Sequence, residues 1–377
     1  MSEPDRRGPA ERPLRIGIDA HAIGERKTGN ERFIANLIPA IRARCDHELV
    51  VYVTNDEAER SLAGARSART AVRRLRPATP FVRVPIGLPL RAARDGLDVL
   101  LVQYEAGPVV PCPVVPVVHD VAFWRHPAFF SPFERAWMRR AIPWTIRRAA
   151  HVVTVSAFSR DEIVDCFGIE PSRIEVALEA ADPVFARPPG VPAGIEPPYV
   201  LAVGNLEPRK NLGVLISAFR RLPERAPEVR ERLVLVGQPA FGAGSIRAEA
   251  ADLVASGRVT FTGYVSDERL VALLAGATAF AFPSLYEGFG LPVVEAMAAG
   301  APTLASDIPV MREVAGDAAV LLPTRDPDAW AEAIAELSRD PARRSELAEH
   351  GRRRAAGYSW KHTADAVLRA LEVAARR

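Results

Sequence analysis

This sequence has few cysteines and no long apolar run. It holds 3 cysteines in 377 residues, and Cys45, Cys112 and Cys166 have no metal-ligand spacing. We therefore expect reduced thiols and no metal site. No apolar run reaches the roughly 20 residues of a membrane-spanning helix. No charged and then apolar signal segment opens the chain, so we expect a cytoplasmic protein.

A large net charge is also missing. The formal charge is +3 at neutral pH, which gives no general argument for a nucleic-acid partner. The stretch from residue 60 to residue 94 carries arginines and no acidic side chain, but it has almost no aromatic side chains that could stack on bases. We expect no binding of nucleic acid.

What the sequence does contain is typical of a soluble globular protein, with 48% hydrophobic and 25% charged residues. Its length favours two domains. Short apolar runs alternate with helical patterns after a loose tail at residues 1–12. We expect strands at 14–18, 49–54, 99–103, 114–118 and 152–155, and then at 199–203, 232–236, 259–262, 278–282, 302–305 and 319–322. Residues 56–76 are expected to form a solvated helix, and residues 360–375 a final helix.

Strands that alternate with helices predict parallel sheets with right-handed crossovers. A segment rich in proline and glycine at 183–198 separates two such runs and is typical of a linker. The predicted fold class is therefore α/β, with two doubly wound, Rossmann-like domains at 13–182 and 199–358. Ligands of such sheets bind beyond the carboxyl ends of the strands, so we expect the site in a cleft between the domains.

The least generic stretch runs from Phe282 to Gly300 and leads from a strand through a glycine-containing loop into a helix. Two carboxylates, Glu287 and Glu295, flank the helix start. Glycines in the loop allow a close approach of the backbone to a ligand, and the amide groups at a helix start favour negative charge. The two carboxylates could perform acid–base catalysis or hold a hydroxyl-rich, phosphate-bearing ligand.

Two further loops follow predicted strands. His119 and Asp120 end the run at 114–118, where His119 is either a satisfied structural residue or a group that faces the cleft. Arg209 and Lys210 follow the strand at 199–203, just before a helix that Asn211 is expected to cap. These two cations could bind phosphate oxygens or be solvated.

Two other motifs argue against a nicotinamide enzyme and against a metal–diphosphate site. The loop from Gly24 to Gly29 lacks the glycine spacing of a dinucleotide-binding fold, which argues against a nicotinamide enzyme. Asp326-Pro327-Asp328 has the form of a metal–diphosphate motif, but its position before a helical pattern predicts an ordinary helix cap.

These motifs occur in one order along the chain: Val-His-Asp, Val-Gly-x-x-x-Pro-Arg-Lys-Asn, Phe-x-Gly-Tyr-Val and Pro-Ser-x-x-Glu-Gly-Phe-Gly-Leu-Pro-x-x-Glu-Ala-Met-Ala. The order resembles that of the retaining glycosyltransferases of family 4, which have the GT-B fold. The segment that begins with Val118-His-Asp is similar to the mannosyltransferase-like branch of polysaccharide and lipopolysaccharide assembly. The resemblance implies an acceptor-side domain at 13–182, a domain at 199–358 that binds a nucleotide sugar, and a helix at 359–377 that returns to the first domain.

The resemblance also implies roles for the residues that match the motifs. His119 would contact the donor sugar, and Arg209 and Lys210 would stabilise the departing diphosphate. Glu287 would hold the sugar or the phosphates, with chemistry at this residue left open. Glu295 would bind ribose hydroxyls. The other donor contacts implied are Gly29, Gly204, Tyr264, Val265, Phe289, Gly290 and Leu291.

The expected function is the transfer of a hexose from a nucleotide-diphosphate sugar, with GDP-mannose favoured, to a glycan or lipid-linked acceptor with retention of configuration. With cations available for the phosphates, neither a metal nor another cofactor is required. The alternatives are a transferase that uses UDP-sugars, a nucleotide-sugar epimerase and a non-catalytic subunit that binds nucleotide sugars.

The stretch from Phe129 to Arg148 interleaves aromatic side chains with arginines. It predicts either a peripheral contact with the inner face of a membrane or a core helix with a solvated arginine face. Pro143 interrupts the pattern and favours the core helix.

Overall fold

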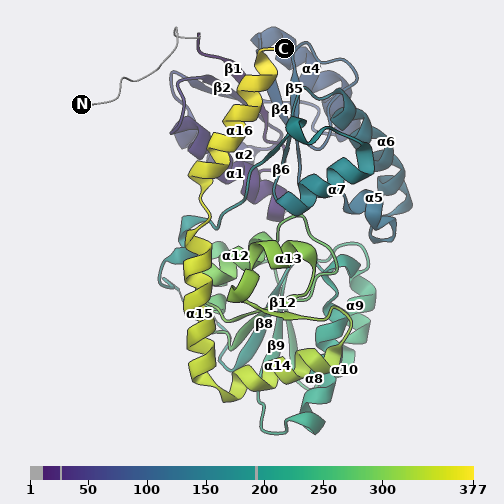
Figure 1. Ribbon diagram of the computed structural model, residues 1–377, viewed down its shortest axis with the longest axis vertical. Helices are drawn as coiled ribbons and strands as arrows, with labels where there is room; N and C mark the ends of the chain where they lie inside the picture. Colours follow the sequence, from purple (N-terminus) through teal and green to yellow (C-terminus); the bar gives the residue numbers. More distant parts are fainter. Residues whose placement is uncertain (1–11, 26–27, 192–193) are drawn as a thin grey trace, which may run out of the picture.

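The computed structural model describes residues 12–25, 28–191 and 194–377. Of the predicted tail at 1–12, only residue 12 is among them. Residues 26–27 of the loop from Gly24 to Gly29 and residues 192–193 of the predicted linker also lie outside the described residues. Two parallel sheets organise the described chain, one in each half, and Figure 1 shows them one above the other along the long axis. The predicted fold class is confirmed.

The first sheet has seven strands in the order β3-β2-β1-β4-β5-β6-β7. Its strands are β1 (Arg15–Asp19), β2 (Glu48–Val53), β3 (Thr70–Arg74), β4 (Val99–Gln103), β5 (Val114–Val118), β6 (Val152–Thr154) and β7 (Ile174–Val176). The helices of this half are α1 (Thr28–Arg42), α2 (Asp56–Ser61), α3 (Pro80–Val82), α4 (Leu88–Asp95), α5 (Ala122–Arg125), α6 (Pro132–Arg148) and α7 (Ala157–Phe167). The central strands are mostly apolar and buried because helices cover both faces of the sheet.

The second sheet has six strands in the order β10-β9-β8-β11-β12-β13. Its strands are β8 (Tyr199–Val203), β9 (Arg232–Val236), β10 (Val259–Gly263), β11 (Ala279–Phe282), β12 (Thr303–Ser306) and β13 (Val320–Leu322). The helices are α8 (Leu212–Arg225), α9 (Ala243–Glu249), α10 (Ala251–Ala255), α11 (Asp267–Gly276), α12 (Leu291–Ala298), α13 (Pro309–Val314), α14 (Pro327–Arg339), α15 (Pro341–Ala356) and α16 (Trp360–Ala375). All six strands predicted for this half are confirmed.

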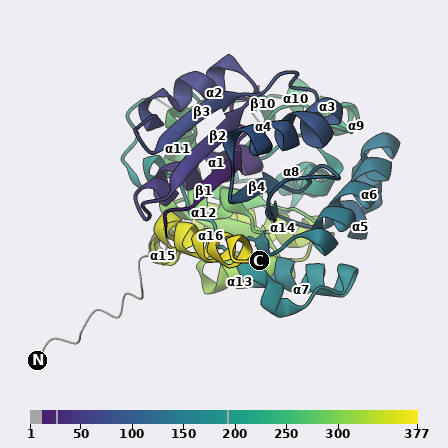
Figure 2. The ribbon, with the colours of Figure 1, turned by 90° about the horizontal axis from the view of Figure 1, so that it is seen from above.

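The final helix α16 crosses back and packs on the first domain, against α1 and the strands β4 to β7 (Figure 1 and Figure 2). Thr363 Oγ1 donates to the carbonyl of Leu178, and Arg44 Nε lies 2.7 Å from the carboxylate of Asp365. The predicted return of the chain to the first domain is therefore confirmed. Within the described residues, no helix combines the length and apolar character needed to cross a membrane.

The solvated helix expected over residues 56–76 is wrong. Helix α2 ends at Ser61, and β3 follows at the edge of the first sheet, where it pairs with β2. Thr70 is buried, whereas the arginines of this strand are partly exposed, as an edge strand allows. Strand β7, at the opposite edge, was also not predicted, nor were helices α13 and α15.

The two domains touch through hydrogen bonds beside the glycine-containing loop. Ser156 Oγ donates to the carbonyl of Gly288 at 2.6 Å, and Ser159 Oγ lies 3.0 Å from the same oxygen. The carboxylate of Glu313 accepts from the backbone amides of Ala157 and Phe158 at the start of α7 (2.8 and 2.9 Å). Helix α7 of the first domain is thus capped partly by the second domain.

Gly288 permits this contact. A Cβ atom at this position would lie 1.8 Å from the backbone oxygen of His119, which no side chain could tolerate. The sequence predicted that the glycines of this loop allow close approach to a ligand. At Gly288 the space is instead taken by the backbone of the opposite domain.

Candidate active site

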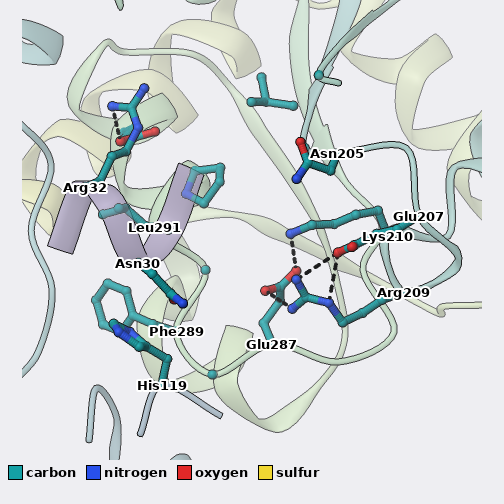
Figure 3. A pocket seen from close by; sticks show the side chains of 18 of the residues that line it. Asn30, Arg32, His119, Asn205, Glu207, Arg209, Lys210, Glu287, Phe289 and Leu291 are labelled. Carbon is teal, nitrogen blue, oxygen red and sulfur yellow. Dashed lines mark hydrogen bonds and ion pairs between the residues drawn. The ribbon is translucent and has the colours of Figure 1, made fainter. Parts of the chain in front are cut away.

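A cavity lies between the carboxyl ends of the two sheets, and its empty space, together with the open solvent at its mouth, measures about 1180 Å³. Every residue proposed from the sequence lines it: His119, Arg209, Lys210, Glu287, Gly29, Gly204, Tyr264, Val265, Phe289, Gly290, Leu291 and Glu295. Figure 3 shows the side chains that face this space. Segments more than 250 residues apart in sequence meet here, because each follows a strand or begins a helix at the same side of its sheet.

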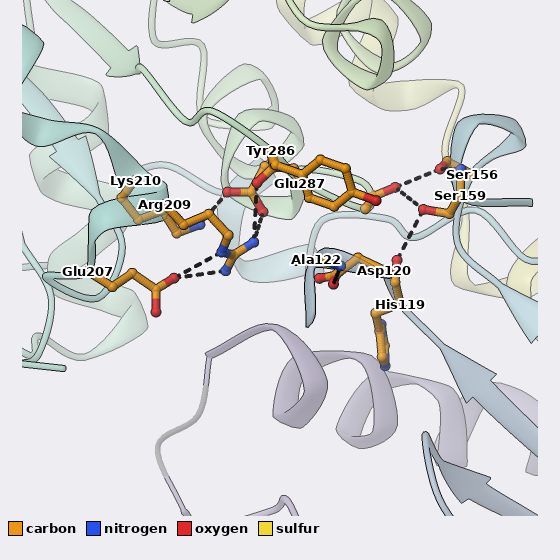
Figure 4. A network of polar contacts seen from close by, with 11 residues as sticks. His119, Asp120, Ala122, Ser156, Ser159, Glu207, Arg209, Lys210, Tyr286 and Glu287 are labelled. Carbon is orange, nitrogen blue, oxygen red and sulfur yellow. Dashed lines mark hydrogen bonds and ion pairs between the residues drawn. The ribbon is translucent and has the colours of Figure 1, made fainter. Parts of the chain in front are cut away.

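Glu287 holds both predicted cations in place. Its Oε1 lies 2.6 Å from Lys210 Nζ, and its Oε2 accepts from Arg209 Nη1 at 2.8 Å. Arg209 also donates from Nε and Nη2 to Glu207 Oε1 at 3.1 and 2.9 Å (Figure 3 and Figure 4). Lys210 Nζ sits 4.9 Å from the centre of the Phe282 ring, a cation–π contact that favours the charged ammonium. The arrangement fixes two positive charges at the cavity wall.

The charges of this group support one another. Burial disfavours an ionised Glu287, but Arg209 and Lys210 more than compensate, and the pKa of Glu287 falls below its usual value. Burial likewise opposes the charge on Arg209, while Glu287 and Glu207 raise the pKa of its guanidinium. Glu287 and Arg209 are therefore both ionised at neutral pH.

Gly204 makes room for Lys210. A Cβ atom at Gly204 would lie 3.1 to 3.4 Å from three carbons of the Lys210 side chain, and the φ angle of Gly204 is +149°.

Asn211 precedes α8, but the expected hydrogen bond from its side chain to the start of this helix is absent. Asn211 has a left-handed backbone, and its side-chain nitrogen donates to the carbonyls of Pro283 and Thr324 rather than capping α8. The residue thereby ties the Arg209–Lys210 turn to the loop that begins the Glu287 motif.

His119 enters the cavity from the opposite domain. Its side chain is buried, its Nδ1 lies 3.2 Å from Glu179 Oε1, and its Nε2 has no hydrogen-bond partner among the described residues. The ring packs edge-on against Phe33 at 4.9 Å between centroids. Tyr104 lies on another side at 5.6 Å. The imidazole is therefore held in one orientation beside the cavity.

Glu295 has a partner that the sequence did not predict. Arg32 of α1 donates from Nη1 to Glu295 Oε1 at 2.7 Å and from Nη2 to Asp267. This places one cation of the first domain between two carboxylates of the second. Burial raises the pKa of Glu295 to about 8; the neighbouring Asp267 adds to this, and the attraction of the shared Arg32 does not overcome it.

Several lining residues were not predicted as site residues, among them Asn30, Arg32, Glu179, Glu207 and Gln238. Glu207 belongs to the Val-Gly-x-x-x-Pro-Arg-Lys motif, so its proximity to Arg209 could have been found. Glu179 follows β7, a three-residue strand without a clear sequence signal. Within the described residues, no group of three or more His, Cys, Asp or Glu side chains is arranged to hold a metal.

Comparisons with known proteins agree with this arrangement. Residues 28–185 match the family described as Glycosyltransferase Family 4, and residues 191–354 match Glycosyl transferases group 1. The chain is 30% identical over 267 residues to O-antigen chain mannosyltransferase B of Escherichia coli, across 69% of this chain and 70% of that protein. It is 33% identical over 228 residues to D-inositol 3-phosphate glycosyltransferase of Rhodococcus jostii, across 57% of this chain and 50% of that protein. The match thus spans only half the length of this second relative.

Among solved structures, HepE of Anabaena in complex with UDP and glucose superposes with a TM-score of 0.72. The superposition covers 95% of this chain and 99% of HepE at 18% identity, which is evidence for the fold alone. The two parallel-sheet domains and the cleft between them have the GT-B fold. The chain belongs to the group 1, family 4 glycosyltransferases.

The raised pKa of Glu295 predicts a pH-dependent stability. The folded state keeps this proton up to about pH 8, whereas an unfolded chain releases it near pH 4.5. Folding therefore loses stability as pH rises from 4.5 to 8. Glu295→Gln removes this effect, so the melting temperature of the variant relative to wild type is expected to rise between pH 5 and pH 8.5. Differential scanning fluorimetry measures both melting temperatures, and Glu332→Gln, at an exposed position, is the control. If the difference in melting temperature between Glu295→Gln and wild type is the same at every pH, the raised pKa is contradicted.

Proposed function

We propose that the protein transfers a hexose from GDP-mannose to a glycan or lipid-linked acceptor, with retention of configuration and without a metal or other cofactor. The observation that carries the proposal is the pair of cations, Arg209 and Lys210, fixed by Glu287 at the cavity that His119 also faces. The mannosyltransferase name of the Escherichia coli relative supports mannose as the sugar.

Departure of the nucleoside diphosphate leaves a sugar with oxocarbenium character and a growing negative charge on the phosphate oxygens. Cations already in place stabilise that charge without reorganising during the reaction. Lys210 has N–H groups beyond the one directed at Glu287, and Arg209 lies on the same wall. The starts of α1 and α12, at Gly29 and Leu291, direct backbone amide groups toward the same space.

The positions of the other residues that line the cleft give the remaining proposed contacts with the nucleotide sugar. Glu295, to which Arg32 Nη1 also donates, would bind ribose hydroxyls. The backbone at Tyr264 and Val265 would lie along the edge of the base. Phe289 and Gly290 would line the sugar and phosphates, and His119 would face the sugar from the first domain. The acceptor would then approach from the side of the first domain.

A ligand screen tests the donor. Free GDP, UDP and ADP and their hexose conjugates are added to the protein, and the shift in melting temperature is recorded. A ligand at one hundred times its dissociation constant stabilises the folded state by about 2.7 kcal/mol. GDP-mannose is expected to give the largest shift. A larger shift with a UDP-sugar would reassign the donor, and no shift with any nucleotide sugar would refute the proposal.

The same ligands separate the rival functions. Conversion of one nucleotide sugar to another without an acceptor would indicate an epimerase. Binding without transfer or hydrolysis would indicate a non-catalytic subunit. Analysis of the anomeric configuration of the product by NMR tests retention.

Lys210→Ala is expected to lower kcat by about 100-fold, the effect of removing one preorganised donor to a developing negative charge. Steady-state rates with the donor that the screen identifies measure it. Lys361→Ala, at an exposed position of α16, is the matched control and should retain wild-type rates. Normal turnover of folded Lys210→Ala would refute the phosphate role.

We also propose that the first domain rests on an anionic membrane through α6. Pro143 does not interrupt this helix, which runs from Pro132 to Arg148 and is capped by Ser131 and Glu134. Only four residues near its end are buried. Phe133 is 65% exposed, and its ring contacts that of Phe81, which is 52% exposed, at 5.8 Å. The helix lies at the outer edge of the domain (Figure 2).

The arginines around these rings favour an anionic partner. Five arginines of α6 have no carboxylate partner among the described residues: Arg135, Arg139, Arg140, Arg147 and Arg148. In contrast, Arg125 of the adjacent α5 pairs with Glu162 and Asp165. Aromatic side chains with unpaired cations around them are typical of surfaces that enter the headgroup region of a bilayer.

Flotation of the full-length protein with lipid vesicles at physiological salt tests this contact. We expect binding to vesicles that contain phosphatidylglycerol and little binding to phosphatidylcholine alone. The triple variant Arg135→Gln, Arg139→Gln, Arg140→Gln should bind about 100-fold more weakly, since each basic residue contributes about 1 kcal/mol. In the control variant, glutamine replaces Arg343, Arg352 and Arg353 of α15. Equal binding by the two triple variants, or none by wild type, would refute the contact.

A further inference from the structure

Glu179 is one of the residues of the cleft to which neither the motifs nor the comparisons assign a role. It lies just beyond the carboxyl end of β7, in the segment that leads out of the first domain. Its side chain is only 4% exposed, and its Oε1 lies 3.2 Å from His119 Nδ1. A buried carboxylate needs such a partner, because burial without one is costly.

The contact fixes which nitrogen of His119 carries a proton. A carboxylate accepts hydrogen bonds, so Nδ1 is the donor in this pair. The other nitrogen, Nε2, is buried and has no partner among the described residues, although the ring lines the cavity. On a neutral imidazole with the proton on Nδ1, Nε2 is a hydrogen-bond acceptor.

The packing of the ring prevents His119 from exchanging its two nitrogens. Phe33 presents an edge-on contact with an interplanar angle of 89°, and Tyr104 is tilted against another side of the ring. The backbone of His119 is fixed as well, because its carbonyl oxygen accepts a hydrogen bond from Ser159 Oγ at 3.1 Å. A ring flip would move Nδ1 away from Glu179 and leave a buried carboxylate without its donor.

We propose that Glu179 is a positioning residue that holds His119 with Nε2 as an acceptor for a hydroxyl group of the donor sugar. This inference rests on the proposed function and extends it to the recognition of the sugar. The proposed contacts with the base and with the ribose hydroxyls come from Tyr264, Val265 and Glu295 of the second domain, whereas His119 belongs to the first. Glu179 therefore acts on the sugar part of the donor and leaves the affinity for the free nucleotide unchanged.

The test compares wild type with Glu179→Gln, whose amide group can donate to Nδ1 and so place the proton on Nε2. Isothermal titration calorimetry with the nucleotide sugar that the screen identifies should show about tenfold weaker binding, the effect of one hydrogen bond. Titration with the corresponding free nucleoside diphosphate should give the wild-type value. Equal losses for both ligands would overturn the role in sugar recognition. If wild type binds no nucleotide at all, the proposed function itself fails.

A double-mutant cycle separates positioning from a purely structural role. In a His119→Ala background, Glu179→Gln should cause no further loss of sugar-nucleotide affinity or of kcat/KM, because its effect passes through the imidazole. Glu175→Gln on β7, whose carboxylate pairs with Arg369, controls for the substitution at a nearby, partly exposed site. A full additional loss in the His119→Ala background would show that Glu179 acts independently of His119 and would overturn the proposal.

Discussion

The ion-pair group around Glu287 is the interaction on which the second domain's side of the cleft depends. A buried carboxylate is tolerated only with compensating charge, and both Arg209 and Lys210 supply it. The same contacts keep the two cations from extending into solvent, where they would be hydrated and mobile. Because Asn211 ties their turn to the loop before Glu287, the backbone and the charges support one another. Loss of one member would therefore disturb the placement of the others.

The parts of this site that the sequence predicts are those contained in one continuous stretch. The strand, loop and helix from Phe282 to Gly300, and the turn that carries Arg209 and Lys210, have strong local signals: apolar strands, glycines and a proline at a helix start. All six strands of the second domain were predicted for the same reason, since each contains a short apolar run. The four inner strands are almost wholly buried, whereas the edge strands β10 and β13 are partly exposed. The final helix was predicted because its apolar residues recur at helical spacing.

The rest depends on contacts that no local pattern encodes. The edge strands β3 and β7 have one neighbour each, so their sequences tolerate polar residues and read as loops or helices. Missing β7 meant missing Glu179, which lies beyond its end. Arg32 and Glu295 are 263 positions apart, and nothing in either segment predicts their pairing before the two domains are placed together. Helix α15 is largely polar and packs against the domain through few apolar positions.

The carboxylates of the cleft share a property that bears on how a donor would bind. Glu179, Glu287 and Glu295 each contact a cation or an imidazole rather than empty space, and Glu207 contacts the same guanidinium as Glu287. A negatively charged ligand would therefore meet ion pairs in which the cationic side chain can also donate hydrogen bonds to the ligand. For Glu295, contact with ribose requires sharing or displacing Arg32, a residue of the opposite domain. If Glu295 binds ribose as proposed, the affinity for the nucleotide and the contact between the two domains are linked through this guanidinium.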